Sequence, residues 1–191
     1  MRAVKPLLVI RRATYRAGAA LIAALIGTHA YALTGTNLCA GVRTDEVKAL
    51  IGEAPGPPNA SGPVADDDHP DAIATSCRFA GKDRIFALML LDFKSVSDAS
   101  AALQHDIATV KASGDAKVDP AISSGLGEEV YLAHEANSAT YIARQGPRLI
   151  AIGVAGVIDG VPSLDARLLK LAQIALGRLP PPTLKPEPSQ N

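Results

Sequence analysis

The sequence predicts an α+β fold, in which a mostly antiparallel sheet carries helices packed on it as a two-layer sandwich. Apolar residues recur with helical spacing in three segments and form strand-like runs in five others, in the order α-β-β-α-β-β-β-α. Most links between neighbouring strands are too short for the crossover that parallel strands require. One strand is apolar on both faces, so we expect protein to cover each side of it.

The first predicted helix begins at Thr44, which we expect to be its N-cap, and ends at Gly52. Two acidic residues follow Thr44 directly, where the positive end of the helix dipole favours them. The apolar side of this helix consists of Val47, Leu50 and Ile51. Residues 53–71 contain five prolines among glycine and serine, and this composition predicts a loop.

Two strands are predicted next, over 75–79 and 84–93, and the second is the strand that is apolar on both faces. A helix over 95–113 follows, with Ser95 as its N-cap. Its buried stripe is Ala99, Leu103, Ile107 and Val110. Residues 115–127 are polar and predict a further loop, in which Gly125-Leu126-Gly127 indicates a turn with positive φ.

Three strands and a helix complete the predicted domain. The strands span 129–133, 139–144 and 148–154. The turn Gln145-Gly146-Pro147 joins the last two as a hairpin. The helix opens at Pro162-Ser163 and ends near Leu179, before three prolines that cannot continue it.

Charge divides the chain of 191 residues unevenly. The formal charge is zero overall, but the first 32 residues hold five basic residues and no acid. This basic start, the apolar run over 17–27 and the Ala30-x-Ala32 site predict a secretory signal peptide over 1–32, cleaved after Ala32. An uncleaved membrane anchor is the alternative, although a spanning helix needs about 20 apolar residues.

Cleavage would leave a periplasmic or secreted bacterial protein with a single α+β domain over 33–179 and a disordered, proline-rich tail over 180–191. The remaining chain has 14 basic and 19 acidic residues, which argues against nucleic-acid binding. We expect no further membrane span in it.

Cys39 and Cys77 are the only cysteines of the chain. An even cysteine count in an exported protein predicts pairing, so we expect a disulfide between them. A redox pair and a metal site are the alternatives, but the C-x-x-C spacing and an ordered histidine pair are both missing.

Six short segments follow one another in a recognisable order: Leu38-Cys39, Thr44–Gly52, Ser76–Phe79, Asp98–Ala102, Gly125–Tyr131 and Arg148–Ile152. This order resembles a broad group of small exported bacterial domains of unknown function. In that group a cysteine precedes a short helix that ends in glycine, a second cysteine starts the first strand, and a Gly-Leu-Gly-acid segment leads into a later strand. The resemblance covers most of residues 36–178 and implies an α+β sandwich like the PsbP-type fold, with no activity or catalytic residue to transfer.

The run Asp66-Asp67-Asp68-His69-Pro70-Asp71 is the segment with the most reactive groups. Clustered carboxylates can hold Ca²⁺. The calcium-loop pattern needs a glycine at its sixth position and a glutamate at its twelfth, where this sequence has Asp71 and Cys77. We therefore expect a solvated loop and no metal site.

The histidines come without a nucleophile motif such as G-x-S-x-G. His105 lies beside an apolar helix stripe, which places it at the surface or its boundary. His134 comes at the end of the predicted strand over 129–133, near Glu128 and Glu129, and these three are the candidate residues if the chain is an enzyme. We predict that it is not, and that it has no catalytic residues and no cofactor.

The sequence favours an exported, non-catalytic domain that binds an unknown protein partner or belongs to an assembly of the cell envelope. A periplasmic small-ligand binding domain is the alternative, with the strand over 84–93 as the floor of its pocket. A deep apolar pocket in the folded protein would favour the small-ligand binding domain. A large exposed apolar patch would favour the domain that binds a protein partner. A histidine–carboxylate pair buried in a cleft would favour an enzyme, the third hypothesis.

Overall fold

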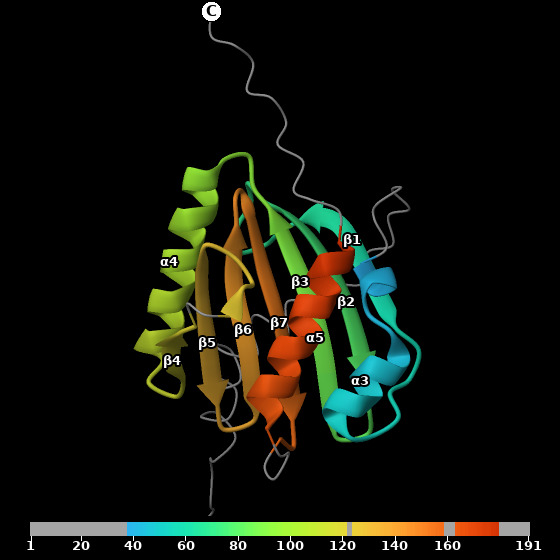
Figure 1. Cartoon of the computed structure of the whole chain (residues 1–191). Coiled ribbons are helices and arrows are strands. Elements are labelled where there is room, and N and C mark those ends of the chain that lie inside the picture. The colour runs from blue at the N-terminus through green and yellow to red at the C-terminus, as the bar shows by residue number, and fades with distance from the viewer. Residues whose placement is uncertain (1–37, 122–123, 159–162, 180–191) are drawn as a thin grey trace, which may run out of the picture.

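A seven-stranded antiparallel sheet lies at the centre of the protein, in the strand order β1-β2-β3-β7-β6-β5-β4 (Figure 1). The structure is a computed structural model that describes residues 38–121, 124–158 and 163–179. The strands are β1 (Asn59–Ala65), β2 (Ile73–Ala80), β3 (Arg84–Asp92), β4 (Lys117–Pro120), β5 (Glu129–Glu135), β6 (Ser138–Gln145) and β7 (Arg148–Gly156). The helical elements are the 3-10 turn η2 (Leu38–Gly41), α3 (Thr44–Ile51), α4 (Val96–Ala112) and α5 (Leu164–Arg178). The predicted α+β class and antiparallel sheet are confirmed.

Helices cover both faces of the sheet, so the protein has three layers where the sequence predicts two. Alternate residues of β3 point to opposite faces. Phe86 and Leu88 join the core with α3 and α5, which lie in front of the sheet in Figure 1. Met89 and Leu91 join a second core with α4. Because β3 is apolar on both sides, as predicted, each face requires its own cover.

The two strands that sequence analysis missed form the two edges of the sheet. β1 lies within 53–71 and β4 within 115–127, both predicted as loops. Each contains a proline, Pro63 in β1 and Pro120 in β4, and the register between β1 and β2 shifts around Pro63. An edge strand forms hydrogen bonds with a neighbour on one side only, so it can contain a proline, which has no N–H to donate. It also does not require a continuous apolar run.

The start of α3 differs from the prediction, because Arg43 and not Thr44 is its N-cap. The Glu46 carboxylate accepts a hydrogen bond from the backbone N–H of Arg43 at 2.9 Å. This carboxylate anchors the cap residue, so the helix begins without a threonine side chain at the N-cap position. The other predicted signals hold: Gly52 ends α3 with a φ of 77°, and Ser95 caps α4.

Cys39 and Cys77 form the disulfide that the sequence predicts, with their Cα atoms 5.1 Å apart. The bond joins η2 to β2 within the core that α3 and α5 share. It therefore ties the first described element of the chain to the sheet.

Several predicted features lie outside the described residues. These are the signal peptide over 1–32 with its cleavage site at Ala32, the tail over 180–191, and Pro162 at the start of the last helix. Ser163 precedes the first residue of α5, Leu164. Among the helices that the structure describes, none combines the length and hydropathy needed to cross a membrane.

Candidate functional site

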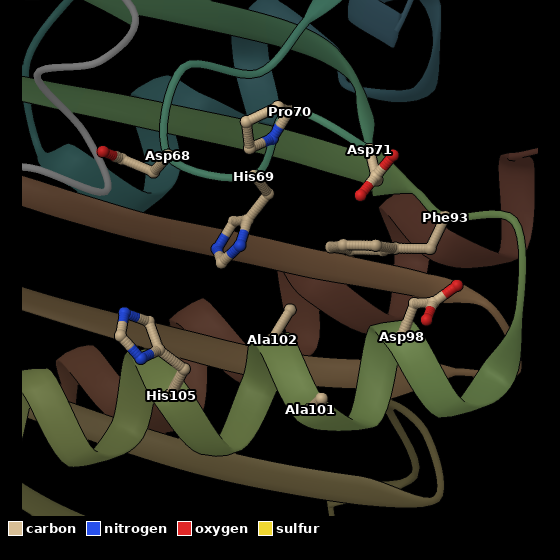
Figure 2. Close-up of a pocket in the computed structure, with 9 residues that line it drawn as sticks. All are labelled: Asp68, His69, Pro70, Asp71, Phe93, Asp98, Ala101, Ala102 and His105. Carbon is tan, nitrogen blue, oxygen red and sulfur yellow. The ribbon is translucent and has the colours of Figure 1, made fainter.

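An open cleft of about 310 Å³ lies between α4 and residues 66–72, which precede β2 and which we call the 66–72 loop. Figure 2 shows the loop on one side of the cleft, α4 on the other, and Phe93 extending between them. The lining residues are Asp68, His69, Pro70, Asp71, Phe93, Asp98, Ala101, Ala102 and His105. Two segments far apart in the sequence therefore enclose one space.

The 66–72 loop is folded back on itself by its own hydrogen bonds. The Asp66 carboxylate accepts from the backbone N–H of Asp68 at 3.2 Å and of His69 at 2.8 Å. The Asp66 N–H donates to the carbonyl of Ala72, and the Ala72 N–H donates to the carbonyl of His69. An aspartate that accepts from residues two and three positions later forms a tight turn. This turn points the side chain of His69 toward α4 (Figure 2).

His69 of the 66–72 loop and Asp106 of α4 form a pair beside the cleft. Nε2 of His69 lies 3.0 Å from Oδ1 of Asp106, and the two side chains are only 13% and 15% exposed. Burial raises the pKa of Asp106 above its ordinary value, although the charge and the hydrogen bond of His69 oppose the shift. In the acidic run over 66–71, which the sequence predicts to be a solvated loop, Asp67, Asp68 and Asp71 are exposed. Its histidine, His69, instead points inward and pairs with Asp106.

Two further rings pack around His69. Its centroid lies 5.7 Å from that of Phe93 and 6.5 Å from that of His105, both in edge-to-face geometry. His105 is exposed, as predicted. Phe93, His105 and Asp106 contact the His69 ring on several sides, and the ring forms part of the wall of the cleft.

The residues that sequence analysis proposed for an enzyme do not meet. Glu129 and His134 lie near opposite ends of β5. Arg144 contacts both Glu128 and Glu129 at 2.9 Å. Burial opposes ionisation of Glu129, but hydrogen bonds from Arg144 and Gln104 lower its pKa below the ordinary value. Both glutamates therefore form ion pairs with one arginine of β6.

His134 has a different partner, Asp165 in the first turn of α5. Its Nε2 lies 3.1 Å from Oδ2 of Asp165, and the side chains are 35% and 47% exposed. The Tyr141 hydroxyl donates a hydrogen bond to the carbonyl of Asp165 at 3.5 Å, and burial raises the pKa of Tyr141. The contact links the sheet to α5 at its surface.

The described residues include no group of three or more histidine, cysteine, aspartate or glutamate side chains that could hold a metal ion. In the cleft, His69 is already paired with Asp106.

Sequence analysis missed the His69–Asp106 pair because 37 residues separate its members. The two signals present were a histidine inside an acidic run and an aspartate next to Ile107 of the buried helix stripe. Neither signal reveals that the 66–72 loop passes over α4.

No family model matches this chain, and no curated protein matches it. Among solved structures, it is similar to the extracellular domain of PknH from Mycobacterium tuberculosis, at 10% sequence identity and a TM-score of 0.39, over 73% of this chain and 97% of that one. A similarity this low transfers no ligand, partner or location. The resemblance to small exported bacterial domains stays a prediction.

Proposed function

We propose that this protein is an exported, non-catalytic domain that binds a protein partner in the cell envelope, and that the cleft beside α4 is its binding site. The observation that carries the proposal is the cleft itself, where an aromatic ring and several polar groups from two distant segments face the same open space. Export is supported by the basic, acid-free start of the chain and by the Cys39–Cys77 disulfide.

The composition of the cleft suits non-covalent binding. Its lining residues are aspartate, histidine, phenylalanine, proline and alanine, so none of them offers a hydroxyl or thiol nucleophile. The cleft is open and bordered by exposed carboxylates, which suits contact with another protein's surface.

The test is affinity capture of the tagged, exported protein from its native envelope, with mass spectrometry of bound proteins and small molecules. Ala101→Trp fills the cleft from α4, and Ala108→Trp places the same ring on an exposed position of that helix outside the cleft. We expect a reproducible partner that Ala101→Trp loses and Ala108→Trp keeps. The absence of any protein partner, or equal retention by both variants, would contradict the proposal.

Export has its own measurement, the mass of the mature N-terminus. We expect the chain to begin directly after Ala32. A mature protein that retains residues before Ala30 would contradict cleavage at this site.

A second candidate function is acid–base catalysis, favoured by the largely buried His69–Asp106 pair at the cleft. Asp106 would hold one ring nitrogen of His69, and the other would accept a proton from a bound molecule. The captured partner or small molecule decides between the two candidates. If the wild-type protein changes the chemical structure of this molecule and His69→Gln does not, as followed by NMR and mass spectrometry, catalysis is favoured. An unchanged structure favours binding.

A further inference from the structure

We propose that the cleft binds a protonated basic side chain, a lysine or an arginine, that the partner protein presents. This inference rests on the proposed function, because it names the chemistry of the group that would enter the proposed binding site. It follows from the charges at the rim, the position of one aromatic ring, and the size of the space.

Three carboxylates, those of Asp68, Asp71 and Asp98, border the cleft, and no lysine or arginine is among its lining residues. Lys94 contacts Asp71 at 3.3 Å, but both side chains are about 80% exposed. Such an exposed pair is weak and can open. The carboxylates of Asp68 and Asp98 accept no hydrogen bond and form no ion pair with any residue that the structure describes. The rim is therefore a negative surface whose charge is largely uncompensated.

The lining residues include two imidazoles, those of His69 and His105, but no lysine or arginine. Nε2 of His69 lies 3.0 Å from Oδ1 of Asp106, so this imidazole already has a carboxylate partner within the protein. The cleft consequently offers carboxylates to an entering group and presents no fixed cation that would repel a lysine or an arginine.

Phe93 supplies a second attraction for the same kind of group. In Figure 2 its ring extends into the cleft between Asp71 and Asp98, while His69 meets the edge of the ring. The faces of the ring are therefore free of His69. A cation over the face of an aromatic ring is attracted by its negative face, and a carboxylate beside it adds a direct ion pair.

The volume of the cleft, about 310 Å³, is at the lower end of the range for ligand pockets. It suits one long side chain that inserts from a partner's surface better than a large cofactor. Lysine and arginine combine an apolar stem, which Phe93 and Ala102 can contact, with a charged end for the rim.

The test uses a defined probe, Nα-acetyl-lysine-N-methylamide, and its neutral Nε-acetylated form. Two-dimensional NMR of the ¹⁵N-labelled domain follows the backbone amides during titration. We expect the charged probe to bind with a Kd on the order of 1 mM and to shift signals at Asp71, Phe93 and Asp98. The neutral probe should bind at least about fivefold more weakly, and added salt should weaken the charged probe alone.

Two substitutions make the test specific. Asp98→Asn should reduce the affinity for the charged probe about two- to fivefold, with little effect on the neutral one. Asp67→Asn is the control, since Asp67 is an exposed aspartate of the 66–72 loop that does not line the cleft. Equal binding of both probes, shifts outside the cleft, or equal effects of the two substitutions would overturn the inference.

The outcomes separate this inference from the proposed function. A partner lost by Ala101→Trp, without binding of the charged probe at the cleft, would leave the binding function in place and overturn the basic side chain. Binding of the probe at the cleft without any captured partner would support the chemistry of the site and contradict the proposed function.

Discussion

The two faces of the sheet are covered in different ways. On one face η2, α3 and α5 pack against one another as well as against the sheet, and the Cys39–Cys77 disulfide and an Arg178–Glu46 ion pair at 2.8 Å tie them together. On the other face α4 packs over β4, β6 and β7, and its next neighbour is the 66–72 loop. The cleft lies where a loop, and not a second helix, meets α4, so the less densely braced face is the one with room for a partner.

The two histidine–aspartate pairs follow the same division. His69–Asp106 on the α4 face is largely buried, whereas His134–Asp165 beside α5 is about half exposed. The two pairs have the same chemistry, but we expect the buried pair to contribute more to the free energy of unfolding. Water solvates the exposed pair in both the folded and the unfolded chain.

Removing the disulfide should have the largest effect. The double substitution Cys39→Ala/Cys77→Ala opens a loop with a sequence separation of 38, and we expect it to lower the free energy of unfolding by about 4 kcal/mol. Urea denaturation of the oxidised and the substituted protein measures the difference. A loss below about 1 kcal/mol would show that this face is held by packing alone.

The two pairs should differ when each loses its aspartate. Asp106→Ala leaves His69 without its partner in a largely buried place and should cost about 1–3 kcal/mol. Asp165→Ala removes a half-exposed partner and should cost about 0–1 kcal/mol. Thermal and urea unfolding of both variants provide the comparison. Equal losses would contradict the view that burial separates the pairs.

The pH dependence of stability should change in Asp106→Asn. The folded-state pKa of Asp106 is raised, so its contribution to stability is present below the ordinary value of 3.8 and is lost as pH rises through the raised value. The asparagine variant lacks this loss, and its unfolding free energy should fall less over that range. Urea titrations in steps above pH 4 test this, and a slope identical to that of the wild type would contradict it.

Glu46 should show the opposite dependence, with the smallest effect. The hydrogen bond from Arg178 lowers the pKa of Glu46, although burial opposes it, so its contribution is present above the ordinary value of 4.5 and lost as pH falls through the lowered value. Glu46→Gln should remove that acid-side loss. Acid titration followed by circular dichroism measures it, with Asp45→Asn as a control in the same helical turn. Asp106 and Glu46, one on each face, would then change the free energy of unfolding in opposite directions as pH falls.

The elements predicted well from the sequence are those whose buried residues follow a regular spacing along the chain. β3 is a continuous apolar run, and α4 has a regular buried stripe from Ala99 to Val110. β1 and β4 were missed because an edge strand is specified by the neighbour to which it bonds, and its own residues can include Pro63 or Pro120. The turn with positive φ at Gly125 was predicted correctly, with a φ of 70°.

Among the candidate site residues, too, the sequence predicted some contacts correctly and others incorrectly. Cys39 and Cys77 could be paired from composition alone, because two cysteines allow one intramolecular bond. The enzyme candidates Glu128, Glu129 and His134 were grouped by closeness in sequence, but successive strand residues point to opposite faces and β5 carries its ends apart. Glu128 and Glu129 share Arg144 as their partner, and His134 pairs with Asp165 instead.

The sequence by itself determined the α+β class, the apolar central strand and the disulfide, because each depends on periodicity, counting or local composition. The export segment over 1–32 stays a prediction. Only the tertiary structure decided that helices cover both faces, that proline-containing segments close the two edges, and that His69 meets Asp106 beside Phe93. Each of these features depends on contacts between residues that are far apart in the sequence. Such contacts leave no periodic pattern in the sequence, so they appear only when the chain has folded.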